Sequence, residues 1–146
     1  VFFGLVAVMG SYFVCTHTFG TAKLLLPAFS AGALGVAVLN VNNMRDIEPD
    51  RAVRVTVAGK LGERGAKIYH TVLIAVAWAA MIAYAMLCFY DPWHYLFVLS
   101  LPLFIWHLVG VWKNSSAELD MYLPELVFSA LLFCLLAGGG FLIYLI

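Results

Sequence analysis

The sequence predicts an all-α fold, a polytopic bundle of transmembrane helices, from three observations. Of the 146 residues, 64% are hydrophobic and 11% are charged, and the mean hydropathy is +0.99, which excludes a water-soluble globular protein. Five segments with at most one charged residue each match the roughly 20 residues that span a bilayer as a helix. Their uninterrupted apolar runs lack the alternating polar residues of membrane β-strands. The predicted helices are residues 1–22, 24–44, 68–90, 95–112 and 123–146.

The first two predicted helices are joined by a short polar turn that ends near Lys23. The chain opens with Val1 directly in an apolar run, without the basic region or the cleavage site of a signal peptide. We therefore expect a single transmembrane domain that is the C-terminal portion of a longer protein. In the second helix, Gly32 and Gly35 favour the close approach of a neighbouring helix.

Two short segments connect the last three helices. Residues 91–94 predict a tight turn with an interfacial tryptophan, and residues 113–122 lead to the fifth helix, where Glu125 is expected at the cytoplasmic headgroup level. The three cysteines stand singly and the four histidines show no ligand spacing, so neither a disulfide framework nor a zinc site is predicted. The histidines are expected to be interfacial or hydrogen-bonded within the bundle.

Charge is concentrated in one segment, the predicted loop 45–67. Lys+Arg and Asp+Glu balance at eight each, so no nucleic-acid partner is predicted. Six of the eight basic residues lie in this loop, and short loops rich in Lys and Arg stay on the cytoplasmic side of a membrane. We expect the loop to be cytoplasmic, together with the Val1 end and residues 113–122, in a multi-pass protein of the cell (inner) membrane.

The loop begins with oxygen-bearing side chains at four-residue spacing. As a helix, Asn42, Asp46 and Asp50 would lie along one face, and three hard oxygen ligands suit Mg²⁺, which usually binds one or two carboxylates together with substrate phosphates. Pro49 favours a turn or kink before Asp50, from which the carboxylate could still reach a shared ion.

Arginines next to these carboxylates predict a diphosphate site. Arg45, Arg51 and Arg54 can each donate hydrogen bonds to phosphate oxygens. Three alternatives remain open: a solvated cytoplasmic loop, a transporter or channel fragment whose aspartates bind a permeating cation, and a catalytically inactive remnant. A transporter would be expected to carry acids in the middle of its spans, whereas these acids lie at a helix end.

Residues 41–51, Val-Asn-Asn-Met-Arg-Asp-Ile-Glu-Pro-Asp-Arg, resemble the second aspartate-rich motif of the UbiA-type intramembrane aromatic prenyltransferases. Within that superfamily, the Asn-Asn-x-Arg-Asp form is most similar to the 1,4-dihydroxy-2-naphthoate prenyltransferases of menaquinone biosynthesis. Residues 1–11 and 61–69 also resemble that family. Agreement at three separate places argues against a chance match.

The resemblance implies a nine-helix bundle in which the five helices here are the fifth to the ninth. It implies that Asn42, Asp46 and Asp50 bind Mg²⁺, that the two aspartates are catalytic, and that Arg45 and the later basic residues bind a prenyl diphosphate. The acceptor would be 1,4-dihydroxy-2-naphthoate or another aromatic or tetrapyrrole ring. The first aspartate-rich motif would lie in an N-terminal half of the same protein, so the chain alone is expected to be inactive.

The sequence departs from the family pattern directly after the motif. The family usually has Gly-Lys-Arg-Thr, whereas Arg54, Val55 and Thr56 follow Val53 here. This departure moves the expected phosphate contact from a lysine to Arg54, and Lys60 joins the predicted diphosphate-binding residues.

Overall fold

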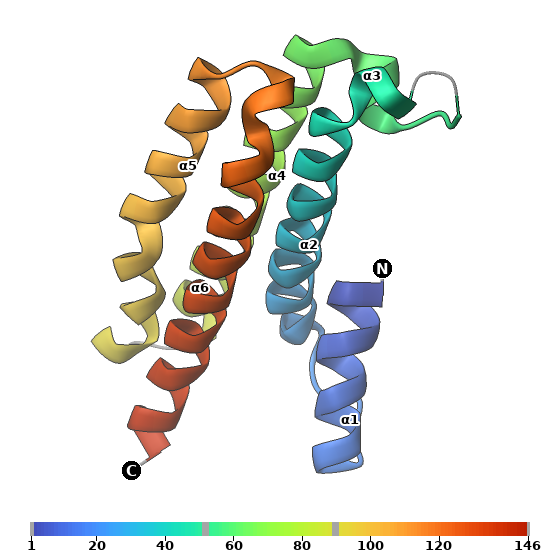
Figure 1. Cartoon of the computed structure of the whole chain (residues 1–146). Helices are drawn as coiled ribbons and strands as arrows, with labels where there is room; N and C mark the ends of the chain where they lie inside the picture. The colour runs from blue at the N-terminus through green and yellow to red at the C-terminus, as the bar shows by residue number, and fades with distance from the viewer. Residues whose placement is uncertain (1, 51–52, 89–90, 146) are drawn as a thin grey trace.

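The structure, a computed structural model, describes residues 2–50, 53–88 and 91–145, and within these ranges every regular element is a helix or a helical turn (Figure 1). The π-helical and 3₁₀ elements carry the label η. In chain order the elements are η1 (Phe2–Met9), α1 (Gly10–Thr16), η2 (Ala22–Leu24), α2 (Leu25–Arg45), α3 (Ile47–Asp50), α4 (Val57–Cys88), η3 (Pro92–Ser100), α5 (Leu101–Lys113), η4 (Ser116–Met121) and α6 (Tyr122–Leu145).

Four helical stretches of the described chain are long and apolar enough to cross a membrane. They are Ala22–Arg45, Val57–Cys88, Pro92–Lys113 and Glu118–Ile143. In Figure 1, α2, α4, α5 and α6 run side by side, and η1 with α1 lies against one end of α2. The prediction of a polytopic helical bundle is therefore confirmed.

The first helix is shorter than the predicted span 1–22. It ends at Thr16, so the apolar stretch Phe2–Thr16 falls short of the length of the other four. His17 adopts a left-handed conformation with φ of 55°, and its backbone N–H donates to the Phe13 carbonyl at 2.7 Å. A residue in this conformation closes a helix by satisfying one of its last free carbonyls.

The predicted loop 45–67 is largely helical in the structure. It contains α3 and the beginning of α4, which starts at Val57, where the Thr56 hydroxyl accepts the Gly59 N–H at 3.0 Å. Gly62, with φ of 68°, then interrupts α4 in a conformation that residues with a side chain rarely adopt. Hydropathy alone could not reveal these short polar helices, because they do not cross the membrane.

Small and aromatic side chains hold the bundle together. Gly4 approaches Ala28 and Gly32 so closely that a Cβ at Gly4 would overlap the backbone of α2. Between α4, η3, α5 and α6, the ring of Trp78 lies 5.2–5.6 Å from the rings of Phe97, Phe104 and Phe133. Edge-to-face contacts at such distances stabilise a buried cluster beyond the burial of its area. This cluster fixes the helices on which the polar end of the bundle is built.

Candidate functional site

The candidate site lies where α2 passes into α3. The Asp46 N–H donates to the Asn42 carbonyl at 3.2 Å, and the Asp50 N–H donates to the Asp46 carbonyl at 2.8 Å. Helix-type hydrogen bonds thus continue across the kink at Asp46, and the three predicted ligands stay on successive turns. The kink lies before Ile47 rather than at Pro49, because Pro49 occupies the first turn of α3, where a missing N–H is tolerated.

The Arg45 side chain binds two of the predicted metal ligands. Its Nε donates to Asp46 Oδ1 at 2.7 Å, and its Nη2 donates both to Asp46 Oδ2 at 2.9 Å and to Asn42 Oδ1 at 3.0 Å. Its Nη1 donates to Asp120 Oδ1 at 3.1 Å. The bidentate contact with Asp46 fixes the plane of the guanidinium.

Arg54 forms a second ion pair with the motif. Its Nη2 lies 2.8 Å from Oδ2 of Asp50, four positions earlier in the sequence. Hydrogen bonding to Asp50 raises the pKa of the Arg54 guanidinium, and the charge of Asp46 adds to this effect. Conversely, hydrogen bonds from Arg45 lower the pKa of the Asp46 carboxyl, with a smaller contribution from Arg54. Arg54 therefore acts electrostatically on both carboxylates.

A small pocket of about 180 Å³ adjoins Asp50 and brings Arg54 and Lys60 to one place. Thr56, directly before α4, adds a hydroxyl group, and Ile47, Val55 and Gly59 complete the lining. Of the four predicted diphosphate-binding residues, Arg45, Arg54 and Lys60 are described around the motif, whereas Arg51 lies outside the described residues. Two cationic side chains and one carboxylate therefore line the same pocket.

The oxygen set of the motif fits magnesium by its chemistry. Asn42 offers an amide oxygen, and Asp46 and Asp50 offer carboxylates on consecutive turns. In residues 2–50, 53–88 and 91–145, no three or more His, Cys, Asp or Glu side chains are grouped as ligands of one metal. A metal here would thus take few protein ligands and complete its coordination with phosphate oxygens and water, as Mg²⁺ commonly does.

An apolar groove of about 620 Å³ runs from Asn42 along the bundle between η1, α2 and α6. Along α2 it extends from Asn42 to Ala31, a separation of eleven positions that corresponds to about 17 Å at a rise of 1.5 Å per residue. The groove begins at a predicted metal ligand. Its lining is otherwise apolar or small: Phe3, Ala31, Leu34, Gly35, Val38, Leu39, Leu123, Val127, Ala130, Leu131 and Cys134.

A buried polar cluster escaped the sequence analysis. His70 Nε2 and His107 Nε2 lie 3.0 Å apart, and both side chains are buried. Glu125, in the first turn of α6, places its Oε2 3.8 Å from His107 Nδ1, with its side chain 22% exposed. The expectation of hydrogen-bonded histidines holds for this pair. Polar residues inside apolar segments were the available signal, but their pairing across α4, α5 and α6 requires the fold.

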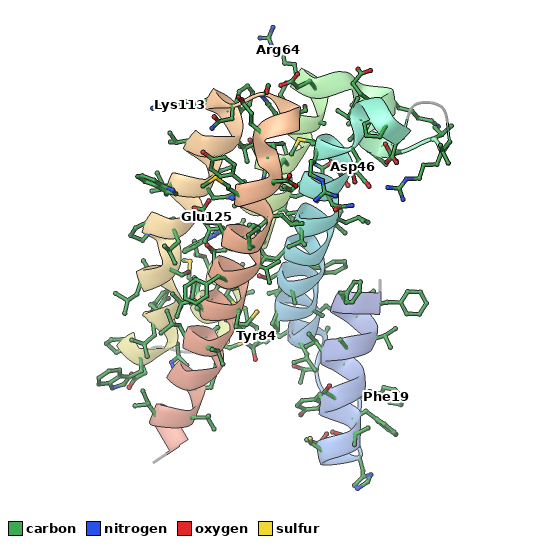
Figure 2. The ribbon with its side chains drawn as sticks, viewed as in Figure 1. Phe19, Asp46, Arg64, Tyr84, Lys113 and Glu125 are labelled. Atoms are coloured by element: carbon green, nitrogen blue, oxygen red, sulfur yellow. The ribbon has the colours of Figure 1, made fainter. Side chains whose placement is uncertain are left out.

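Figure 2 shows where the motif lies in the bundle. Asp46 lies at the end that also carries Arg64 and Lys113, whereas Phe19 lies toward the opposite end. Lys23 also lies away from the motif, because its Nζ donates to the Leu87 carbonyl near the far end of α4. Among the described basic residues, Arg54, Lys60, Arg64 and Lys113 therefore lie at the same end of the bundle as the candidate site.

Comparisons with known proteins identify the family of this sequence. Residues 1–132 match the model of the UbiA prenyltransferase family. A protein of Haemophilus influenzae named 1,4-dihydroxy-2-naphthoate octaprenyltransferase is 39% identical over 145 residues, 98% of this chain and 47% of that protein. Proteins of the same name from Escherichia coli and Mycobacterium tuberculosis are 40% identical over 106 residues and 35% identical over 104 residues. These alignments cover 72% and 70% of this chain and 34% of each relative.

The chain spans about half the length of the Haemophilus relative. Its alignments with the Escherichia and Mycobacterium relatives each cover about a third of the relative. No solved structure matches the chain. The family match covers most of the sequence. It includes the whole motif and every residue that lines the groove except Cys134. The chain therefore belongs to the UbiA prenyltransferase family.

Proposed function

We propose that the chain is part of an Mg²⁺-dependent enzyme that transfers a polyprenyl group from prenyl diphosphate to 1,4-dihydroxy-2-naphthoate in menaquinone biosynthesis. The observation that carries this proposal is that Asn42 belongs both to the acidic motif and to the lining of the apolar groove. A substrate with a charged head and a long apolar chain matches such a junction. The names of the relatives support the choice of acceptor.

The motif side chains would hold the metal and the head of the substrate. Asn42, Asp46 and Asp50 are the proposed ligands, and bound Mg²⁺ would neutralise charge on the diphosphate. Arg45 and Arg54 already face the carboxylates at hydrogen-bond distance, and Lys60 lines the pocket beside Asp50. The role of Arg51 rests on its place in the sequence alone.

The reaction would start with cleavage of the allylic C–O bond, whose electron pair leaves with the diphosphate. Arg45, Arg54 and Lys60 stabilise the negative charge that grows on the leaving group. The apolar groove excludes water from the allylic cation, which would otherwise be captured as an alcohol. The electron-rich naphthoate ring then forms the new C–C bond, and the ring carbon loses its carboxylate as CO₂.

We further propose that the complete site includes an N-terminal half of the same protein with a first aspartate-rich motif. The Haemophilus relative is about twice as long as the region that it shares with this chain. The position of the basic residues at the motif end supports a cytoplasmic site in a multi-pass protein of the inner membrane. The 146 residues alone are then expected to bind substrate incompletely and to lack activity.

The test is prenyl transfer in membranes that contain either the chain alone or the longer protein with its N-terminal half. Product is measured with a long-chain prenyl diphosphate and 1,4-dihydroxy-2-naphthoate, in Mg²⁺ or in EDTA. The proposal expects product only from the longer protein and only with Mg²⁺. Transfer to a different aromatic ring would correct the acceptor, and no transfer to any acceptor would refute the enzymatic role.

A further inference from the structure

We propose that Asp120, on the connection between α5 and α6, is a positioning residue that orients Arg45 for the diphosphate. This inference rests on the proposed function of the motif. Asp120 lies 75 positions from Arg45 in the sequence, yet its Oδ1 accepts a hydrogen bond from Arg45 Nη1 at 3.1 Å. The contact ties the motif to the connection that leads into α6.

The guanidinium of Arg45 has five N–H groups in a rigid plane. Among the described residues, four hydrogen bonds use four of them: three go to Asp46 and Asn42, and one goes to Asp120. One Nη1–H then remains for a phosphate oxygen. Because Asp120 binds the other hydrogen of the same nitrogen, it adds to the contacts with Asp46 and Asn42 in orienting this edge of the guanidinium.

Asp120 is 74% exposed, but the backbone that carries it is held firmly. The preceding residue, Leu119, is fully buried, and η4 packs against α2. The start of η4 is closed by a capping box, in which the Ser115 hydroxyl donates to Glu118 at 2.9 Å and the Glu118 side chain accepts the Ser115 N–H at 3.0 Å. The carboxylate therefore does not depend on a mobile loop for its place.

Two further hydrogen bonds tie this connection to the bundle. Lys67 Nζ, on α4, donates to the Asn114 carbonyl at 2.7 Å, and Asn114 Nδ2 donates to the Tyr122 hydroxyl at 2.8 Å. These bonds connect the segment that carries Asp120 to α4, to the end of α5 and to the start of α6, and so fix the position of Asp120 along the bundle relative to α2. A positioning residue needs this kind of support, because its own hydrogen bond to Arg45 is exposed and weak.

Charge and geometry predict effects of opposite sign. If Asp120 acted only through its negative charge, removing it would strengthen the binding of an anion near Arg45. If Asp120 orients Arg45, removing it weakens that binding. Since Asp120 is largely exposed and screened by salt, we expect orientation to outweigh charge at physiological ionic strength.

The experiment titrates inorganic diphosphate, with Mg²⁺ present, into the purified longer protein by calorimetry. Asp120→Ala should raise the Kd about two- to five-fold, the range expected for one exposed ionic contact. Asp120→Asn keeps an oxygen that can accept from Nη1 and should raise it less. Glu48→Gln, which removes an exposed charge on α3 without altering Asn42, Asp46 or Asp120, is the control and should leave the Kd unchanged.

A second series repeats Asp120→Ala in an Arg45→Ala background. A residue that acts through Arg45 should have no further effect there, and thermal melting should show coupling between the two substitutions without any substrate. Tighter or unchanged diphosphate binding in Asp120→Ala, or an equal effect in both backgrounds, overturns the positioning role. If the unsubstituted protein transfers no prenyl group and binds no diphosphate, the proposed function itself fails.

Discussion

Replacing Asp46 by asparagine removes one negative charge from the centre of the motif while the size of the side chain is kept. The Asp46 carboxylate accepts hydrogen bonds from Arg45 at 2.7 and 2.9 Å, and its side chain is only 24% exposed. An asparagine can accept one of these bonds but presents an N–H₂ group to the other donor. The substitution therefore disturbs both the proposed metal ligand and the orientation of Arg45.

The expected decrease in kcat/KM follows from the hydrogen bonds and the metal contact that the substitution removes. A hydrogen bond to a charged group contributes about 1.5–3 kcal/mol, and the proposed metal contact loses an ionised ligand as well. A combined loss of about 2–4 kcal/mol in transition-state binding corresponds to a roughly 30- to 1,000-fold decrease in kcat/KM, at 1.36 kcal/mol for each factor of ten. Most of the decrease should appear in kcat, because charge grows on the leaving group as the bond breaks.

The assay is prenyl transfer by the longer protein in detergent or membranes. Glu48→Gln is the matched control, because Glu48 lies on the same short helix, is exposed and is outside the Asn42, Asp46 and Asp50 set. Thermal melting checks that each variant is folded. If Asp46→Asn keeps more than a third of the activity while Glu48→Gln loses it, the assignment of the motif residues is wrong.

Three further predictions concern stability, each measured by thermal unfolding in detergent. The pKa of the Asp46 carboxyl is lowered in the folded protein, so Asp46 contributes stability above its usual pKa of 3.8. This contribution is lost as the pH falls through the folded pKa. The difference in melting temperature between the unsubstituted protein and Asp46→Asn should therefore vanish in strong acid. His107→Phe leaves the buried Nε2 of His70 without its partner and should cost about 1–3 kcal/mol; an unchanged melting temperature would contradict this hydrogen bond. Gly110→Ala directs a Cβ into the ring of Tyr122 and should cost about 1–3 kcal/mol, unless Tyr122→Leu in the same chain restores the space.

The sequence was most informative where structure depends on local composition. Hydropathy located four spans close to their final positions, because an apolar helix in lipid must satisfy its own backbone hydrogen bonds. The spacing of Asn42, Asp46 and Asp50 placed them on successive turns, because this spacing follows from helix geometry. The same reasoning placed Arg45 and Arg54 beside the carboxylates, and the structure pairs each with an aspartate.

Local composition was less informative at the ends of helices. The first helix ends at Thr16 although the charge-free run continues to Ala22, because the left-handed His17 closes it. The region 45–67 looked like a loop because it is polar, yet α3 and the start of α4 form there. Polarity shows that a segment leaves the bilayer, but capping contacts such as that of Thr56 decide whether it is helical.

The sequence by itself determined the membrane class, the motif and the family to which both point, since each depends on residues close together along the chain. Only the tertiary structure decided which distant side chains meet. It brought Asp120 to Arg45, paired His70 with His107, and placed Asn42 at the head of an apolar groove shared by three helices. These contacts depend on the crossing angles of separate helices and on their relative positions along the bundle axis. Close-packed side chains over the whole bundle set both quantities, and no single segment does so.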